Sequence, residues 1–300
     1  NGAAASESGV GEIIVTAQRR SESINSVGMS ISALAGDDLQ QKQITTPSDL
    51  ARIVPGFTAQ PTPYNTPVYT LRGVGFYDSS LAASPSVSVY MDEIALPYSA
   101  MTKGASFDLE RVEVLKGPQG TLYGQNSTGG AINYIAAKPT STPKAGLDVS
   151  FGRFATLKLG GYVSGPVSDT LNARIAVRTV QAGDWQKSYT RHAELGDKNQ
   201  VQGRLLLDWQ PNDSFSLLIN LNGWTDRGDT QAAQLAYIDL QAPFGSPIAD
   251  YPLAPNNARA ADWNPVPLRR RENFWQASAH AQYQVSDAVA LHSLTSYSKL

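Results

Sequence analysis

The sequence predicts a small mixed α+β domain that is followed by antiparallel strands of a membrane-spanning β-barrel. Three observations support this fold class. Apolar and polar side chains alternate along at least six segments of residues 145–300, which is the period of a strand with one apolar face. The connections between these segments alternate in length, as they do in β-barrels of membranes. All five tryptophans lie after residue 144, so the chain divides into two regions of different composition.

Composition excludes several classes of protein. The 300 residues contain 24 Lys and Arg and 26 Asp and Glu, and a net charge of −2 offers no basic surface for DNA or RNA. The absence of cysteine removes disulfides, zinc fingers, iron–sulfur ligation and thiol catalysis. Neither a carboxylate pair nor a Ser/His/Asp arrangement stands at a recognisable spacing. We therefore predict no catalytic residue, no metal site, no cofactor and no enzymatic activity.

The pattern along the chain predicts three regions. Residues 1–18 form an N-terminal segment that is polar apart from a short β-prone run at residues 12–17. Residues 19–144 form the α+β domain, and residues 145–300 form the strand-rich region. The boundary follows a stretch of Pro, Thr and Ser at residues 139–143, which is typical of a linker.

Several short elements are expected before the boundary. Residues 12–17 have the β-propensity to add as a strand to the sheet edge of another protein, or to form an ordinary first strand. A helix is expected to start near residues 48–51, and Pro55 and Gly56 end the element that precedes them. Strands are expected at residues 68–71, 87–91, 111–115 and 131–136.

One apolar stripe runs along the strands of the second region. It includes Leu147, Val149, Phe151, Val163, Ile175 and Val177, while Arg174, Arg178, Gln202, Arg204, Asn220 and Gln276 have the opposite parity. A soluble sandwich fits this alternation as well as a membrane barrel does. Alternating loop lengths and aromatic side chains at strand ends favour the barrel. These aromatic residues are Phe151, Trp209, Phe215, Trp275 and Tyr283.

Residues 145–300 hold about seven such strands, and the pattern of the last one is interrupted at residue 300. An open sheet edge in lipid leaves main-chain N–H and C=O groups without partners, which is strongly unfavourable. We therefore expect these residues to be the N-terminal part of a longer chain, whose intact mass would be more than about twice as large for a complete wide barrel.

The densest signal is the segment at residues 109–139, LERVEVLKGPQGTLYGQNSTGGAINYIAAKP. Its glycines are expected to allow positive φ angles or close backbone packing; they are Gly117, Gly120, Gly124, Gly129 and Gly130. A nucleotide-binding loop is excluded, because no Gly-Lys-Ser/Thr sequence closes the pattern and the glycines that begin at Gly73 lack a third member at Asp78.

This segment resembles the plug-domain signature of TonB-dependent outer-membrane receptors. Residues 12–17 resemble the TonB box, residues 69–74 resemble the plug strand that ends in Arg-Gly, and residues 87–93 resemble the strand after it. The resemblance implies a plug inside a barrel of about 22 strands in the bacterial outer membrane. It also implies TonB-dependent active transport of a scarce nutrient, most often an iron siderophore.

The resemblance implies partners as well. They are the C-terminal domain of TonB, with ExbB and ExbD at the inner membrane, outer-membrane lipid and lipopolysaccharide, and a small ligand such as a ferric siderophore. No nucleic acid is expected among them. The TonB box would pair with TonB as an added strand; its residues are Glu12, Ile13, Ile14, Val15, Thr16 and Ala17.

Two further groups of site residues follow from the resemblance. The plug motif consists of Arg72, Gly73, Glu110, Arg111, Glu113 and Lys116 with the five glycines named above. Its arginines are expected to meet carboxylates of the barrel wall, with Asp208 as a candidate, or else the motif only stabilises the plug. Ligand contacts are expected from the plug apices and the long loop: Tyr64, Asn65, Phe76, Tyr77, Asp78, Tyr237, Trp263, Arg269 and Arg270. Aromatic and Arg side chains suit an anionic or aromatic ligand.

Two other functions remain open from the sequence. A secreted or periplasmic β-rich protein could bind a carbohydrate or an aromatic ligand without transport, and it would stay soluble without detergent. A β-rich hydrolase would need a catalytic group that the sequence does not reveal.

Overall fold

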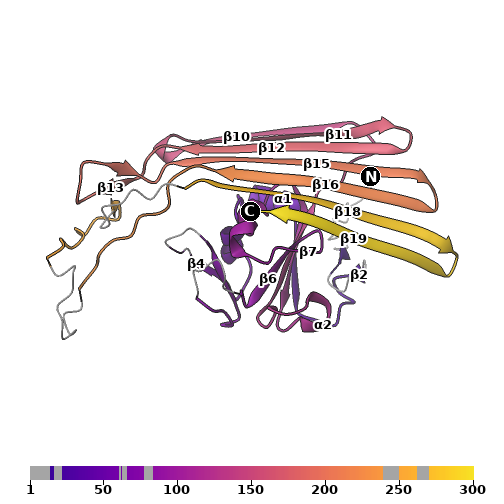
Figure 1. Cartoon of the computed structure of the whole chain (residues 1–300), viewed down its shortest axis with the longest axis horizontal. Coiled ribbons are helices and arrows are strands. Elements are labelled where there is room, and N and C mark those ends of the chain that lie inside the picture. Colours follow the sequence, from indigo (N-terminus) through magenta and orange to yellow (C-terminus); the bar gives the residue numbers. More distant parts are fainter. Residues whose placement is uncertain are drawn as a thin grey trace, which may run out of the picture.

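The computed structural model describes residues 14–16, 22–60, 62, 66–77, 84–238, 250–261 and 270–300. A long sheet of antiparallel strands is built by residues from Lys144 onward, and a smaller domain lies against one of its faces (Figure 1). We call the long sheet the wall and the described part of the chain before Lys144 the small domain. No helix in the described part of the chain is long and apolar enough to cross a membrane.

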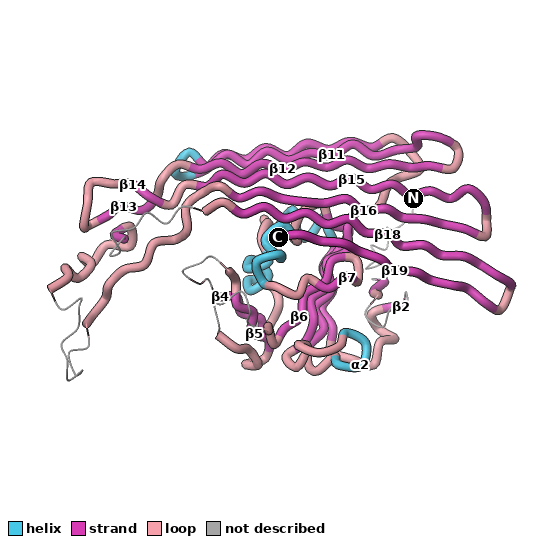
Figure 2. The backbone as a smooth tube through the Cα atoms, in the orientation of Figure 1, coloured by secondary structure: helices cyan, strands magenta, loops and turns pink. Residues whose placement is uncertain are grey.

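Seven long strands of the described residues form the wall, in the order β10-β11-β12-β15-β16-β18-β19. Their bounds are β10 Lys144–Gly152, β11 Thr156–Ser168, β12 Leu171–Ala182, β15 Lys198–Asn212, β16 Phe215–Asp226, β18 Glu272–Ser286 and β19 Val289–Lys299. Each strand pairs antiparallel with the next long one. Short turns lie at one end of the wall and the long loops at the other (Figure 2). The predicted strands are confirmed, and so is the alternation of connection lengths from β11 onward. The connection between β10 and β11, the 3-10 turn η3 Arg153–Ala155, is short although it lies at the end with the long loops.

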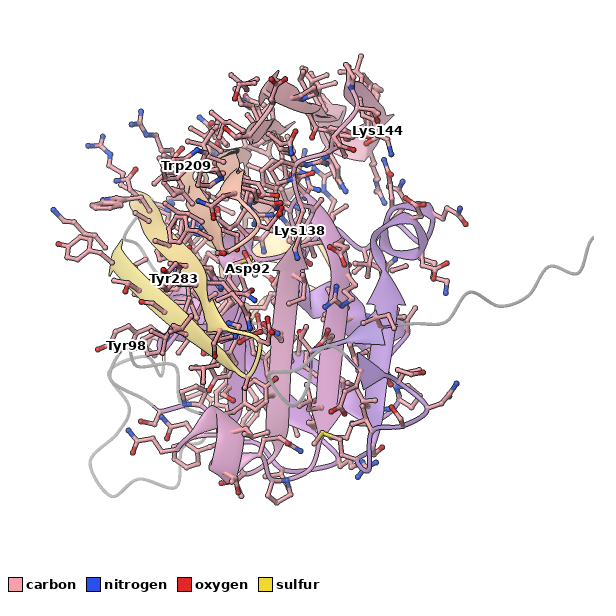
Figure 3. The ribbon with its side chains drawn as sticks, turned by 90° about the vertical axis from the view of Figure 1, so that its right-hand side faces the viewer. Asp92, Tyr98, Lys138, Lys144, Trp209 and Tyr283 are labelled. Atoms are coloured by element: carbon pink, nitrogen blue, oxygen red, sulfur yellow. The ribbon has the colours of Figure 1, made fainter. Side chains whose placement is uncertain are left out.

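The two faces of the wall differ as the alternation predicts. Leu147 and Phe151 are 76% and 78% exposed, and Val163, Ile175 and Val177 are exposed on the same stripe. Arg174, Arg204, Asn220 and Gln276 are buried on the opposite face. Trp209 and Tyr283 lie on the wall in Figure 3, and the rings of Trp209 and Phe215 meet edge to face with their centroids 5.9 Å apart. A continuous exposed apolar stripe of this extent fits contact with lipid.

The buried face of the wall is less polar than the alternation predicts. Leu206, Trp224 and Phe274 have the parity of the polar residues, and all three are buried. Trp224 and Phe274 belong to the same apolar core as residues of the small domain. These side chains are apolar because they pack against another domain, whereas strand periodicity reports only which face they occupy.

The small domain is built on a five-stranded sheet of order β3-β8-β9-β6-β7, in which β6 and β9 are parallel. The strands are β3 Ile31–Ala35, β6 Val87–Met91, β7 Ile94–Ala95, β8 Leu109–Lys116 and β9 Gly130–Ala136. Two short pairs accompany it, β1 Ile14–Val15 with β2 Glu22–Ser23 and β4 Phe57–Gln60 with β5 Val68–Leu71. The helices are α1 Gly36–Gln41, α2 Gly120–Tyr123 and the 3-10 turns η1 Pro47–Arg52 and η2 Ser99–Gly104.

The five-stranded sheet of the small domain has an apolar core on each face. Because side chains alternate along β8, Val112 and Val114 enter the core that contains Trp224 and Phe274 of the wall. Leu115 enters a second core, together with Val15 of β1. The wall therefore covers one face of this sheet, and the N-terminal strand covers the other.

The two long loops of the wall are joined by a small sheet of order β14-β13-β17, with bounds β13 Gln186–Ser188, β14 Glu194–Leu195 and β17 Ala260–Ala261. The buried Gln186 amide donates to the Ala232 carbonyl oxygen at 3.0 Å and accepts from the Ala232 N–H at 2.9 Å. These strands were not predicted, because segments of two or three residues show no periodicity.

Candidate functional site

Arginines of the wall hold the small domain in place. Arg174 of β12 forms two hydrogen bonds with the Asp108 carboxylate, of which the bond from Nε to Oδ2 is 2.9 Å long. Both side chains are nearly fully buried, and the guanidinium also lies 3.8 Å from the centroid of the Tyr162 ring. A two-point contact of this kind fixes the orientation of the two domains as well as their distance.

Two more arginines bind main-chain oxygens beside Asp108. The buried Arg204 donates from Nη1 to the carbonyl oxygens of Phe107 and Asp108, at 2.6 and 2.7 Å. Arg178 donates to the carbonyl oxygens of Thr45 and Ser106, at 3.4 Å each. The guanidiniums of Arg178 and Arg204 lie over the Phe107 ring, at 5.0 and 5.7 Å from its centroid, respectively. We call Arg174, Arg178 and Arg204 with residues 106–108 the seat.

In the seat, the two domains supply the opposite charges from those expected. Arginines of the small domain were expected to meet carboxylates of the wall, whereas the seat pairs wall arginines with a carboxylate and with carbonyls of the small domain. Arg111 instead pairs with Glu110 and Glu113 of its own strand, and the exposed Arg72 donates to Ser30 Oγ at 2.6 Å. Asp208 accepts hydrogen bonds from Gln210. Asp208 is therefore not the partner of Arg72 or Arg111, and the contacts of Arg111 fit the alternative that the motif stabilises the small domain.

A second contact with the wall involves η2. Lys103 forms an ion pair with Glu272 of β18; burial lowers the pKa of Lys103, and the adjacent carboxylate opposes that shift. The Trp224 indole N–H donates to the Met101 carbonyl oxygen at 3.4 Å. Gly104 faces the same ring so closely that an added Cβ would lie 2.4 Å from Trp224 Cδ1.

We expect Gly104→Ala to weaken the docking of the small domain. The added methyl group would overlap the indole ring, which is stacked on Phe274 with its centroid 6.0 Å away, and overpacking of this kind costs about 1–3 kcal/mol. The urea midpoint for unfolding of the small domain should fall. Gly28→Ala is the matched control, since an added Cβ there meets no atom within 4 Å. Equal urea midpoints for Gly104→Ala and Gly28→Ala would show that the packing of Gly104 against Trp224 does not stabilise the small domain.

A third contact lies at the turn between β6 and β7. The Asp92 carboxylate accepts from the Ala136 N–H and from Asn220 Nδ2 of the wall, both at 2.8 Å, at the position labelled in Figure 3. Asp92 and Glu93 have φ angles of 48° and 67°, as a two-residue hairpin turn requires. The range 87–93, which resembles a plug strand in sequence, includes both residues, but its pattern gave no sign of the contact with the wall.

The N-terminal strand is docked on the face of the sheet that is remote from the wall. Val15 is fully buried in the second core, while Ile14 is 44% exposed. The main-chain N–H and the hydroxyl of Thr16 donate to Glu113 Oε1 at 2.8 and 3.1 Å. Glu12, Ile13 and Ala17 lie outside the described residues. Sequence reasoning named residues 12–17 and Glu113 separately and missed that they meet.

The expectation of positive φ angles or close backbone packing holds for four of the five glycines of the motif. Gly117, Gly124 and Gly130 have positive φ angles, and at Gly130 an added Cβ would lie 2.2 Å from the Leu115 carbonyl oxygen. Gly129 approaches the Val74 carbonyl oxygen, at 2.9 Å from an added Cβ. Gly120 shows neither feature and begins α2, so the expectation is wrong there. The motif also includes Gly73, whose φ is 79°, and Lys116, whose pKa is lowered by burial and by Arg72.

The expected ligand contacts are only partly described. Phe76, Tyr77 and Tyr237 are exposed aromatic side chains. Arg270 is buried and forms an ion pair with Asp226 at 3.1 Å, which favours a role in holding the loop. The remaining expected contacts lie outside the described residues: Tyr64, Asn65, Asp78, Trp263 and Arg269.

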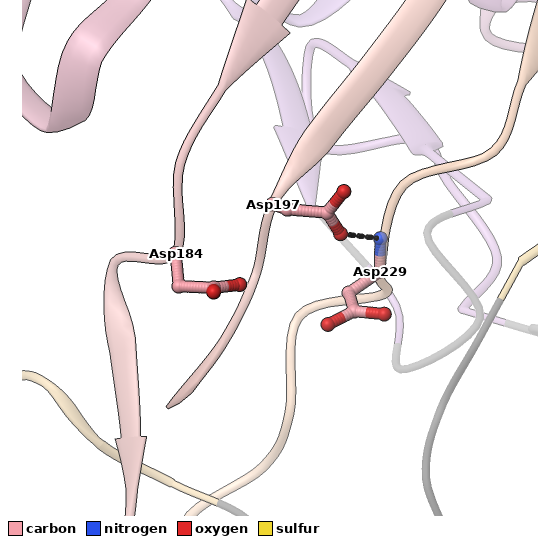
Figure 4. A group of neighbouring side chains, drawn as sticks. All are labelled: Asp184, Asp197 and Asp229. Carbon is pink, nitrogen blue, oxygen red and sulfur yellow. Dashed lines mark hydrogen bonds between the residues drawn. The ribbon is translucent and has the colours of Figure 1, made fainter. Parts of the chain in front are cut away.

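One acidic cluster in the described part of the chain has the spacing of a metal site. Ligand oxygens of Asp184, Asp197 and Asp229 lie within 4.8 Å of one another (Figure 4). Asp197 Oδ1 accepts from the Asp229 N–H at 2.8 Å, and Asp229 Oδ2 accepts from the Gly196 N–H at 3.2 Å. These bonds join the two long loops, and main-chain donors already offset part of the negative charge.

Comparisons with known proteins agree with this architecture. Residues 23–131 match the family described as TonB-dependent Receptor Plug Domain. The chain is 28% identical over 271 residues to the pesticin receptor of Yersinia pestis, covering 86% of this chain and 37% of that protein. It is 29% identical over 232 residues to the ferripyoverdine receptor of Pseudomonas aeruginosa, covering 76% of this chain and 27% of that protein. The chain thus spans well under half the length of these relatives.

A solved structure shares the fold. The crystal structure of the ferric yersiniabactin uptake receptor FyuA from Yersinia pestis matches with a TM-score of 0.74 at 20% identity, covering 90% of this chain and 40% of that chain. Together with the docked domain and the two-faced wall, these similarities identify residues 23–131 as the plug domain of TonB-dependent receptors, and they make the chain similar to outer-membrane receptors, with the small domain corresponding to their plug and the seven long strands among the described residues to part of their barrel wall.

Proposed function

We propose that this protein takes up a scarce nutrient, a ferric siderophore, across the outer membrane at the expense of energy supplied through TonB. The observation that carries the proposal is the plug itself, which is tied to the polar face of the wall by the seat while the opposite face of the wall exposes an apolar stripe. The relatives named above are receptors for pesticin and ferripyoverdine and an uptake receptor for ferric yersiniabactin, which supports an iron chelate as the cargo.

The two ends of the molecule suit two different partners. The β4–β5 pair of the plug lies toward the end of the wall that carries the long loops, and β2 lies toward the end with the short turns (Figure 1). In the proposed function the ligand arrives at the loop end, where Tyr237 of the long connection between β16 and β18 is exposed. The C-terminal domain of TonB pairs with residues 12–17 at the other end by strand addition.

Uptake by a deletion strain tests the proposal. We expect the gene to restore growth under iron limitation with one ferric siderophore from a panel that also includes carbon sources. Uptake of that labelled chelate should exceed uptake by the deletion strain. The same gene in a strain without TonB should restore binding of the chelate to cells at 0 °C but no accumulation. Equal accumulation with and without TonB would refute energy coupling.

A further inference from the structure

We propose that Glu113 is a positioning residue that keeps the TonB-binding strand docked, and that removing its charge releases this strand in the absence of ligand. The inference rests on the proposed function, because it concerns regulation of the strand assigned to TonB. We call the contact of Thr16 with Glu113 the latch.

The latch is built on a buried carboxylate. Glu113 has no exposed surface, and a charge in that position requires hydrogen-bond donors. Three donors are present: the Thr16 N–H at 2.8 Å, the Thr16 hydroxyl at 3.1 Å and Arg111 Nε at 2.7 Å from Oε1. Because two of these three belong to Thr16, undocking the strand leaves the carboxylate with a single donor from this group. The charge therefore favours the docked state.

Within the described residues 14–16, the strand has few contacts besides the latch. β1 and β2 share only two residue pairs, Ile14 with Ser23 and Val15 with Glu22. Val15 contributes the apolar part of the contact, since it is fully buried in the core that contains Leu115, Tyr90 and Ala131. Leu115 and Glu113 are two residues apart on β8 and so face the same side of the sheet. Among the described residues, the Val15 side chain, the Glu113 carboxylate and a 3.4 Å hydrogen bond from Arg111 Nη2 to the Thr16 hydroxyl thus hold the strand on the face that the wall does not cover.

Thiol labelling of Val15→Cys measures the release directly. These 300 residues contain no cysteine, and any cysteine elsewhere in the full-length receptor is replaced by serine. The thiol at position 15 is protected from maleimide while the strand is docked. In the full-length receptor without ligand, Glu113→Gln should accelerate labelling by about tenfold, because a hydrogen bond to a charged group is worth more than one to a neutral amide. Thr16→Val, which removes the hydroxyl but keeps the N–H, should give a smaller acceleration.

The control variants separate release from unfolding. Glu110→Gln makes the same chemical change on the same strand, and Glu110 pairs with Arg111 but does not contact Thr16, so labelling of Val15→Cys should keep the wild-type rate. Val54→Cys reports on the opposite core and should stay protected in Glu113→Gln. An unchanged rate at residue 15 would overturn the latch, and so would equal loss of protection at residue 54, which would show a general structural role.

Capture of the TonB C-terminal domain distinguishes the latch from the proposed function. Both are supported if Glu113→Gln binds this domain without ligand while the wild type requires a ferric siderophore. If labelling accelerates but no variant binds TonB with or without ligand, the latch is supported and the TonB proposal fails. If the wild type shows ligand-dependent binding but Glu113→Gln labels at the wild-type rate, the latch fails and the function is retained.

Discussion

Ile14→Pro is expected to abolish energy-dependent uptake while leaving the receptor folded and able to bind its ligand. Proline lacks the N–H that a strand donates to its partner, so the segment assigned to TonB loses a ladder hydrogen bond. Ile14 is 44% exposed and β1 is only two residues long, so the plug loses little when this position changes. Uptake of a labelled ferric siderophore should fall to the level of a strain without TonB.

A control and a second readout make this prediction specific. Ile14→Val keeps the N–H and the β-branched side chain, and it should transport at about the wild-type rate. Binding of the chelate to cells at 0 °C should be the same in all three proteins. Wild-type uptake by Ile14→Pro would show that residues 12–17 are not the segment that engages TonB.

Asp108→Asn is expected to loosen the plug more than any other single change in the seat. Asparagine has the size of aspartate and tolerates the left-handed backbone of this residue, whose φ is 51°. It removes the negative charge and leaves the buried Arg174 guanidinium without its carboxylate. Breaking a buried pair by removing one partner costs about 3–5 kcal/mol.

Ion conductance of the receptor in planar bilayers measures this effect. The plug should leave its place at a lower urea concentration in Asp108→Asn, so that conductance begins earlier in the titration. Adding Arg174→Met should recover part of the loss, because the double variant no longer buries an unpaired charge. If the single and double variants both open at the wild-type urea concentration, the pair contributes nothing to docking.

Strand periodicity was sufficient to predict the strands of the wall and the two faces of each strand. The parity that places Leu147, Ile175 and Val177 on one face and Arg174 and Arg204 on the other is a property of each strand by itself, since successive side chains point to opposite sides. The strands at residues 68–71 and 87–91 were also predicted with the observed bounds, because proline or glycine stands near their ends.

Contacts between distant parts of the chain were not predictable in the same way. Thr16 and Glu113 are 97 residues apart in sequence, and Arg174 and Asp108 are 66 apart. Periodicity assigns a side chain to a face but not to a partner. Arginines are present on both β8 and β12, and the sequence does not show which of them pair across the two domains. The docking of the domains brings Asp108 to Arg174 of the wall, while Arg111 pairs with Glu110 and Glu113 of its own strand.

Two arginines of the seat bind main-chain oxygens, so their hydrogen bonds do not depend on which side chains the small domain carries there. Arg178 and Arg204 bind carbonyl groups of Thr45, Ser106, Phe107 and Asp108, and every amino acid supplies a carbonyl. This part of the attachment therefore depends on the path of the backbone, whereas the Arg174–Asp108 pair depends on side-chain identity. A substitution at Ser106 that keeps this path would keep the hydrogen bond from Arg178.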